Sequence, residues 1–309
     1  MVGIRVALMG EPMLELSHPV GQGAKLSYGG DVLNTSIYLA RLGVVPNLVT
    51  ALGTDPYSEG LLKDWERECV QTSYVLRDPE RLPGLYAIQT DHQGERSFYY
   101  WRSKSAARNF FNLDGYSQSV DFMKEADWLY MSGITLSIFT NDEREQLAEI
   151  ARSVKARGGH VVFDPNYRPN GWASPEAARE AIEKFAAHTT LMLATIDDEN
   201  LLYGQMPGEK HAARWHDLGI GAVVLKCGPR GAIIYDKGQL VRRVPVSVCD
   251  QPVDTTGAGD SFNAAFIAMK CRGKSTLKAV EAGNLLASHV IRHPGAIMPL
   301  TEMPDICSS

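Results

Sequence analysis

A glycine-rich turn at residues 254–262 combines residues that can bind phosphate with one that can accept a proton. The small residues Gly257, Ala258 and Gly259 let backbone N–H groups approach a ligand closely. An apolar segment follows at 264–269, so the N–H groups of a helix's first turn would face the same point. A carboxylate at Asp260 would repel phosphate there unless it accepted a hydroxyl proton. The turn predicts a phosphoryl-transfer site, although Gly-Ala-Gly-Asp alone also suits an ordinary helix start.

A second polar turn, at residues 29–35, begins another helical stretch. Gly29 and Gly30 come first, and Asp31 and Asn34 follow three residues apart, so both lie on one face of the helix. Their side chains offer the acceptors and donors that a polyol needs. A capped helix start with a polar first turn explains the same residues equally well. From the local sequence, both interpretations stay open.

The elements that must position these turns alternate along the chain. β-rich runs are expected at 4–9, 47–52, 128–132, 160–164, 190–194 and 222–226, and helices at 32–42, 58–68, 143–157, 175–187 and 210–218. This order predicts an α/β fold with a mostly parallel sheet, helices on both faces and ligands at the carboxyl ends of the strands. A hairpin at 231–244 would extend one edge. We expect one domain spanning residues 1–309.

Two extended segments interrupt the alternation. One covers 14–27 and is broken by Gly21 and Gly23, and the other is an aromatic hairpin at 85–102 with its turn at 91–94. They predict a small β lid built from about residues 12–28 and 82–105. A lid would keep water from accepting a phosphoryl group, although a decorative sheet edge would have the same sequence pattern.

Composition and charge limit the classes of molecule that the protein is expected to bind. A net charge of -5 and a pI near 5.9 give no basic footprint for nucleic acid or an anionic membrane. The five cysteines are odd in number and widely spaced, so neither a disulfide framework nor a zinc site is expected. The chain has no apolar run of membrane-spanning length and starts with a short strand, which favours a cytoplasmic location. Small-molecule chemistry is the better expectation.

The string from Asp254 to Phe262 resembles the signature of the ribokinase/PfkB-type carbohydrate kinases. The resemblance implies a ribokinase-like fold in which the lid covers a sugar, and it gives Asp260 the role of catalytic base. It also implies that the segment containing Gly30, Asp31 and Asn34 binds sugar hydroxyls. Glu11 stands where many relatives have an Asp that contacts the sugar.

Three further segments, 82–86, 99–102 and 163–169, resemble members of that family that act on a keto-deoxy sugar acid. The carboxylate of such a substrate suits a guanidinium that can bind both oxygens. Arg102 and Arg168 are the candidates, and Tyr86 and Tyr100 would add hydroxyl and ring contacts. Each of these side chains could equally serve packing or surface charge. The expected reaction is phosphorylation of the acid's terminal hydroxyl by ATP.

The same resemblance places ATP along the loop at 225–231 and the last helix. The expected nucleotide contacts are Asn166, Lys226, Gly228, Gly231, Asn284 and Ser288. Phosphoryl transfer implies Mg²⁺, and many relatives carry an Asn-x-x-Glu element for it. Here Ile196 falls at the Asn position, which leaves Glu199 as a contact through water. Some relatives also need K⁺, and the sequence does not settle that requirement.

Alternative functions are a kinase for fructose, ribose or 2-keto-3-deoxygalactonate, and a non-catalytic sensor of sugar or nucleotide. A dinucleotide oxidoreductase fits less well, because the third glycine of its fingerprint is missing. Replacement of Arg102 or Arg168 would separate a sugar-acid kinase from one for neutral sugars. Exposed lid strands could pair between subunits, so we also expect a homo-oligomer.

Overall fold

The computed structural model describes residues 3–18, 23–90, 96–246 and 252–306. Its main element is a nine-stranded sheet in the order β13-β12-β11-β10-β9-β8-β1-β4-β5. Neighbours from β11 to β5 pair in parallel, and β12 and β13 add an antiparallel edge. The strands are β1 Val6–Met9, β4 Pro46–Gly53, β5 Gln71–Asp78, β8 Trp128–Ser132, β9 His160–Asp164, β10 Leu191–Thr195, β11 Ala222–Lys226, β12 Ala232–Asp236 and β13 Gln239–Val244.

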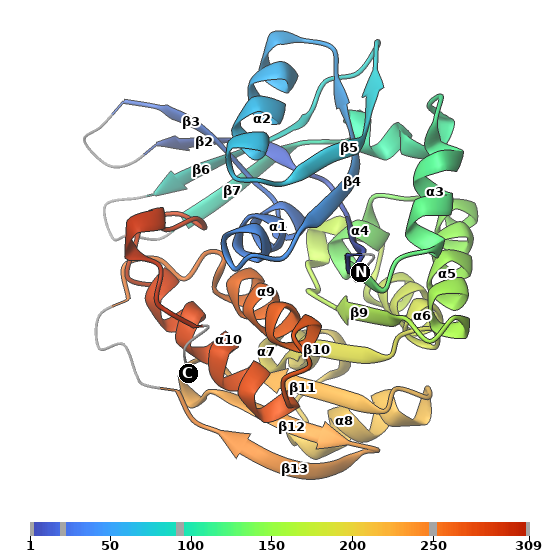
Figure 1. Ribbon diagram of the computed structural model, residues 1–309, viewed down its shortest axis with the longest axis vertical. Helices are drawn as coiled ribbons and strands as arrows, with labels where there is room; N and C mark the ends of the chain where they lie inside the picture. Colours follow the sequence, from blue (N-terminus) through green and yellow to red (C-terminus); the bar gives the residue numbers. More distant parts are fainter. Residues whose placement is uncertain (1–2, 19–22, 91–95, 247–251, 307–309) are drawn as a thin grey trace.

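Helices cover both faces of this sheet, as the alternation predicted (Figure 1). One face packs against α1 Asp31–Arg41, α2 Pro56–Arg67, α9 Ala258–Cys271 and α10 Thr276–Val290. The other packs against α3 Tyr116–Lys124, α5 Asn141–Ala156, α6 Pro175–Ala186 and α8 Gly208–Asp217. The short helices α4 Gly133–Ser137 and α7 Ile196–Tyr203 follow β8 and β10 directly. The predicted α/β class and sheet type are confirmed.

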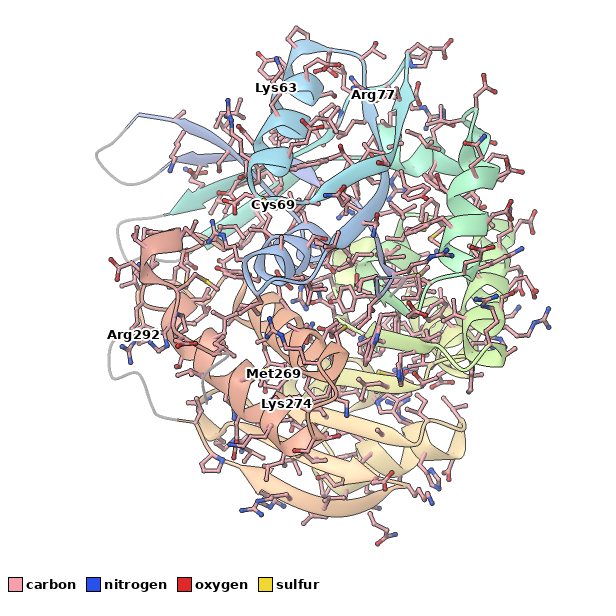
Figure 2. All side chains as sticks on the ribbon, viewed as in Figure 1. Lys63, Cys69, Arg77, Met269, Lys274 and Arg292 are labelled. Atoms are coloured by element: carbon pink, nitrogen blue, oxygen red, sulfur yellow. The ribbon has the colours of Figure 1, made fainter. Side chains whose placement is uncertain are left out.

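Alternating burial explains why the strands form where they do. In β1, Val6 and Leu8 belong to the core under α1 and α9, and Ala7 and Met9 belong to the core on the opposite face. A parallel strand covered on both sides needs apolar residues at every position, which gives a continuous apolar run. Side chains fill the space between the layers on each side of the sheet (Figure 2).

The fold brings α1 and α9 side by side, although more than two hundred residues separate them in the sequence (Figure 1). Both helices begin at the carboxyl edge of the sheet. The polar turns at 29–35 and 254–262 therefore meet at one edge, where ligands of open α/β sheets bind.

The lid segments form a separate four-stranded sheet in the order β3-β2-β6-β7. The strands are β2 Met13–His18, β3 Lys25–Gly29, β6 Gly84–Thr90 and β7 Arg96–Trp101. β2 pairs with β6 in parallel, and the other two pairings are antiparallel. This sheet draws on both expected lid segments. Gly21 and the expected turn at 91–94 lie outside the described residues.

Within the part of the chain that the structure describes, no helix has the length and apolar character needed to cross a membrane.

The contact between α9 and α10 generates a test of packing. A Cβ added to Gly283 would lie 2.7 Å from the ring of Phe262. We expect Gly283→Ala to lower the free energy of unfolding by about 1–3 kcal/mol in urea denaturation. Gly60→Ala is the matched control, because an added Cβ there meets nothing within 4 Å on an exposed face of α2. It should raise the same free energy by roughly 0.5–1 kcal/mol. Equal effects of both changes would contradict the packing argument.

Candidate active site

The turn before α9 has a backbone that only glycine adopts easily. Gly257 is the N-cap of α9 with φ = 75°, and a Cβ on it would lie 2.7 Å from the carbonyl oxygen of Ala296. The N–H of Ala258 bonds the carbonyl of Thr255 at 3.3 Å, so that amide stabilises the turn. Gly259, the second residue of α9, has no side chain over its amide. No side chain at Gly257 or Gly259 therefore prevents a ligand from approaching the backbone, as the sequence analysis expected.

Contacts from two distant segments hold this turn in place. The carboxylate of Asp254 accepts the N–H of Gly295 at 2.7 Å. The hydroxyl of Tyr38, on α1, donates to the carbonyl of Ala296 at 2.8 Å. Because Ala296 also lies directly against Gly257, the turn is clamped between α1 and residues 295–298. Tyr38 was not among the predicted site residues, since nothing in its local sequence sets it apart from core.

Asp260 lies where the two predicted turns meet. Its Oδ2 accepts a hydrogen bond from Nδ2 of Asn34 at 2.8 Å, which joins α9 to α1. Burial and the neighbouring Asp31 raise the pKa of Asp260, the bond from Asn34 lowers it, and the net pKa is about 7. A carboxylate with this pKa is suited to accept a proton near neutral pH.

Asp31 is buried against the same edge. Gly30 precedes it with φ = 129°, and a Cβ there would lie 2.8 Å from the carbonyl oxygen of Glu11. Nδ2 of Asn166 donates to Oδ2 of Asp31 at 3.1 Å, and the backbone N–H of Asn166 donates to Asp164 at 3.1 Å. Burial raises the pKa of Asp31. The side chain of Asn166 thus bonds Asp31, and its expected contact with the nucleotide stays a prediction.

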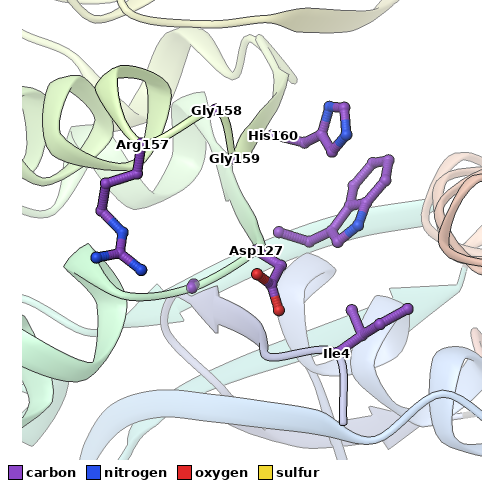
Figure 3. Close-up of a pocket in the computed structure, with 8 residues that line it drawn as sticks. Ile4, Asp127, Arg157, Gly158, Gly159 and His160 are labelled. Carbon is purple, nitrogen blue, oxygen red and sulfur yellow. The ribbon is translucent and has the colours of Figure 1, made fainter. Parts of the chain in front are cut away.

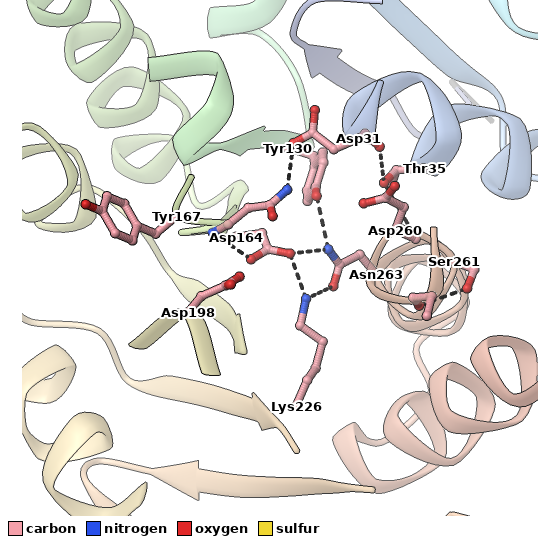
Figure 4. A network of polar contacts seen from close by, with 12 residues as sticks. Asp31, Thr35, Tyr130, Asp164, Tyr167, Asp198, Lys226, Asp260, Ser261 and Asn263 are labelled. Carbon is pink, nitrogen blue, oxygen red and sulfur yellow. Dashed lines mark hydrogen bonds and ion pairs between the residues drawn. The ribbon is translucent and has the colours of Figure 1, made fainter. Parts of the chain in front are cut away.

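A buried network lies behind these groups (Figure 4). Nζ of Lys226, at the end of β11, is 2.7 Å from Oδ2 of Asp164 and 3.1 Å from Oδ1 of Asn263. Nδ2 of Asn263 donates to Asp164 at 2.7 Å and to the hydroxyl of Tyr130 at 3.0 Å. Sequence analysis missed Asp164 and Asn263 as site residues. The sequence held a signal for each of them. Asp164 ends a predicted strand, and Asn263 lies about one helical turn after Asp260.

The lid contributes a paired arginine. Nε of Arg102 donates to Oε2 of Glu11 at 2.7 Å, and its Nη2 forms an ion pair with the same oxygen. Glu11 is 2% exposed. The hydroxyl of Tyr86 bonds Glu15, and the rings of Tyr86 and Tyr100 lie 6.0 Å apart. Since one edge of the guanidinium binds Glu11, its other N–H groups are the ones available to a ligand carboxylate.

Arg168 belongs to a different part of the edge. Its Nη1 lies 2.9 Å from Oδ1 of Asp198, in the first turn of α7, and 2.7 Å from the carbonyl of Tyr167. Its side chain is 55% exposed. The structure therefore pairs the two predicted arginines with different carboxylates, Arg102 with one after β1 and Arg168 with one after β10.

The expected magnesium contact, Glu199, is enclosed by other side chains. Glu199 is 1% exposed and accepts hydrogen bonds from Arg214 at 2.6 Å and from the indole of Trp215 at 3.0 Å. Burial raises its pKa to about 7. Contact of Glu199 with magnesium through a water stays a prediction. Asp198, one residue earlier, is the carboxylate beside Arg168 and Asp164, and Figure 4 shows it facing the network.

The predicted nucleotide loop has the shape of a tight turn. Gly228 and Gly231 have φ of 56° and 81°, and a Cβ on Gly231 would lie 2.1 Å from the carbonyl oxygen of Val244. Asn284 donates to that same carbonyl at 3.2 Å, and the hydroxyl of Ser288 donates to its own helix. These bonds hold α10 against the edge hairpin. Contact of Asn284 and Ser288 with adenine stays a prediction.

A pocket of about 250 Å³ lies elsewhere (Figure 3). It is lined by Asp127, Trp128, Arg157 and His160 among others, and the His160 ring stacks on Trp128 at 4.1 Å. Trp128 and His160 begin β8 and β9, whereas Asp164 ends β9. The pocket is therefore at the amino edge of the sheet, opposite the network, and it belongs to no part of the candidate site.

Known proteins resemble the chain in both sequence and fold. A family model described as pfkB family carbohydrate kinase matches residues 10–303. A 2-dehydro-3-deoxygluconokinase of Escherichia coli K12 is 41% identical over 306 residues, covering 97% of this chain and 99% of that protein. The fructokinase of Vibrio cholerae, solved with fructose, ADP and calcium, superposes with a TM-score of 0.83 at 22% identity, covering 96% of each chain. A protein from E. coli assigned as a ribokinase II, solved with ATP and Mg²⁺, gives 0.82 at 21% identity, covering 99% of this chain and 97% of that one.

The sheet, the helices on both faces and the small lid sheet are those of the ribokinase-like kinases. The chain belongs to the pfkB family of carbohydrate kinases.

The pKa of Asp260 predicts a pH profile. If its carboxylate accepts the proton, kcat/KM should fall about tenfold per pH unit below pH 7 and level off above it. Asp260→Asn should lower kcat by about 10²–10⁴ while the protein keeps its fold, because the amide can replace the carboxylate's hydrogen bonds but accepts no proton. Rates measured from pH 5 to 9 check the profile. A flat kcat/KM down to pH 5 would contradict it.

Proposed function

We propose that the protein transfers the γ-phosphoryl group of ATP to the terminal hydroxyl of 2-dehydro-3-deoxygluconate, giving the 6-phosphate and ADP. The observation that supports the chemistry best is Asp260 at the N-terminus of α9, bonded to Asn34 of the sugar-side helix. The choice of substrate rests on the 41% identity with kinases of that name and on Arg102 beneath the lid. A cytoplasmic location, where ATP is available, is part of this proposal.

The residues divide the transfer between them. The sugar hydroxyl loses its proton to Asp260 as its oxygen forms a bond to the γ-phosphorus, and the bond from that phosphorus to the oxygen of ADP breaks. Backbone N–H groups at the start of α9 stabilise charge on the transferring oxygens. Asp31 and Asn34 hold the sugar so that its terminal hydroxyl faces Asp260.

Mg²⁺ would neutralise the β- and γ-phosphates. Among the described residues, no three Asp, Glu, His or Cys side chains gather to hold a metal ion. This suits an ion held mainly by substrate phosphates and water, as Mg²⁺ commonly is. Asp198 is the carboxylate that would orient one of those waters. Burial raises the pKa of Asp198, repulsion from Asp164 adds to the rise, and a nearby divalent cation would relieve that repulsion.

The lid selects the acid in this proposal. Arg102 would bind the substrate carboxylate with the N–H groups that Glu11 leaves unused, and Tyr86 and Tyr100 would line the sugar. Arg168 bonds Asp198 and the carbonyl of Tyr167 through one guanidinium nitrogen and its side chain is largely exposed, away from the lid. We therefore assign the main role to Arg102 and a smaller one to Arg168.

An apolar face of the lid supports a homo-oligomer. Leu26, Tyr99 and Trp101 lie on the same face, opposite Tyr86, and are 49%, 50% and 61% exposed. A second copy placing the same face against them would bury these side chains. Light scattering should then give at least twice the 34.0 kDa of one chain. A mass of one chain at micromolar concentration would contradict this expectation.

Substrate choice is tested by release of ADP from a panel of sugar acids and neutral sugars, with and without K⁺. Arg102→Gln should raise KM for the sugar acid by about 10- to 150-fold, the effect of losing hydrogen bonds to a charged group. Its effect on a neutral sugar such as fructose should be small. Arg157→Gln, at the opposite edge, is the control.

Loss of Arg102 also leaves buried Glu11 unpaired and lowers stability. The double variant Arg102→Gln/Glu11→Gln removes both charges and should show the same selective rise in KM. Equal losses with the acid and with the neutral sugar would overturn the assignment.

A further inference from the structure

A row of four polar side chains crosses the lid sheet from β3 to β7 (Figure 1). Glu15 on β2 pairs with Ser27 on β3 and with Tyr86 on β6. Tyr86 pairs in turn with Tyr100 on β7. Directly paired residues point to the same face of a sheet, so the four side chains lie together. Burial raises the pKa of Tyr86, and the charges of Glu15 and Asp260 add to the rise. The row therefore lies on the face of the lid that is turned toward the candidate site.

Glu15 is the acceptor at the centre of this row. Its Oε2 accepts the hydroxyl hydrogen of Tyr86, and its Oε1 accepts that of Ser27 at 3.1 Å. An ionised carboxylate has no hydrogen to donate, so both hydroxyls must be the donors. The raised pKa of Tyr86 means that the phenol keeps its hydrogen for this bond. With one donor on each oxygen, the carboxylate is held in one orientation.

The start of the sugar-side helix confines the Tyr86 hydroxyl from another side. A Cβ on Gly29 would overlap this hydroxyl, so the phenol reaches the end of β3 only because Gly29 has no side chain. Gly29 directly precedes Gly30 and Asp31. The oxygen of Tyr86 therefore lies between Glu15 and the segment that we expect to bind sugar hydroxyls.

The bond to Glu15 fixes what Tyr86 can offer a ligand. A phenol has one hydrogen, and here that hydrogen is used by Glu15, so the oxygen can only accept. A sugar hydroxyl can donate to it. A carboxylate or keto oxygen has no hydrogen and would meet the lone pairs of the phenol, which disfavours it at this place. Arg102 has the opposite polarity, because a guanidinium only donates.

We infer that Glu15 is a positioning residue that sets the specificity of the lid, by orienting Tyr86 to accept a hydrogen bond from a secondary hydroxyl of the sugar acid. This role rests on the proposed function and deepens it. Arg102 lies in the next row, where a Cβ on Gly84 would be 3.2 Å from its own Cβ. Adjacent rows on one face of a strand are about 7 Å apart. An acid with its carboxylate at Arg102 would thus present the middle of its chain to Tyr86. In 2-dehydro-3-deoxygluconate the secondary hydroxyls are those on C4 and C5.

Deoxy analogues of the substrate give the first test, because each lacks one donor. The quantity measured is the ratio of kcat/KM for the intact acid to kcat/KM for its 4-deoxy or 5-deoxy analogue. In the native enzyme one of the two ratios should contain about 2- to 13-fold from the bond to Tyr86, the range for neutral groups. Glu15→Leu should remove that factor, mainly through a higher KM for the intact acid. The analogue whose ratio falls identifies the hydroxyl.

Two further variants separate this role from a general effect on the lid. In Glu15→Gln the amide oxygen can accept from Tyr86 and the NH₂ group can donate to Ser27, so the native ratio should be kept. Glu180→Leu, exposed on α6, is the matched control for the leucine. Both substrates are measured on one sample, so the ratio does not depend on how much of a variant is folded. Unchanged ratios in Glu15→Leu would refute the inference.

A double variant shows whether Glu15 acts through Tyr86. Tyr86→Phe removes the accepting oxygen and should lower the same ratio. Adding Glu15→Leu to Tyr86→Phe should then change kcat/KM for the intact acid by less than about twofold, because the two residues act as one unit. If Glu15 bound the sugar by itself, the two losses would multiply, and the positioning role would be wrong.

The two proposals can fail separately. If no sugar acid is phosphorylated, the same ratios are measured with the sugar that is phosphorylated and its deoxy analogues. A ratio that falls in Glu15→Leu would then leave the role of Glu15 standing, while the substrate assignment is wrong. If the sugar acid is a good substrate but Glu15→Leu affects it and both deoxy analogues equally, the role of Glu15 is wrong and the proposed function stands.

Discussion

Charge at the carboxyl edge of the sheet is the constraint that shapes the rest of the site. Several carboxylates converge there around one buried ammonium. Three asparagines compensate by donating amide hydrogens, each to a different carboxylate: Asn34 to Asp260, Asn166 to Asp31 and Asn263 to Asp164. Each of these bonds brings a partial positive charge to a carboxylate that is removed from water. A site that also accepts phosphates needs positive potential to offset the negative charge of these carboxylates. Backbone amides and a metal ion would supply it without further side chains.

The same edge shows why distant segments are needed to build a small turn. Gly257 can adopt its backbone only as glycine, yet its direction is set by Ala296, which is held by Tyr38 of α1. The helix that would present Asp31 and Asn34 to a sugar, as proposed, thus also supports the turn that would face the phosphate. Donor and acceptor sites share one rigid element, which favours a fixed distance between them.

The sequence predicted those parts of the fold whose signal is local. β8, β9 and β11 have the predicted bounds because strands buried on both faces are continuous apolar runs. β5 was missed: it is the edge strand and half-buried, so its apolar signal is weak. The glycine turns were recognisable because they are contiguous, whereas the bond from Asn34 to Asp260 joins residues 226 positions apart. Glu199 was expected because it matches the Glu of the Asn-x-x-Glu element of relatives; successive helix residues point about 100° apart, so the sequence did not show that Asp198 faces the network.

The lid is tied to the sheet by a contact of the same kind. Arg102 follows β7, Glu11 follows β1, and their ion pair joins the two sheets. Oε1 of Glu11 is buried and has no hydrogen-bond partner among the described residues, so this carboxylate depends on Arg102 for compensation. Moving β7 away would leave a buried charge unpaired, at a cost of several kcal/mol. A substrate carboxylate would then enter an arrangement in which the guanidinium is already oriented, which reduces the entropy lost on binding.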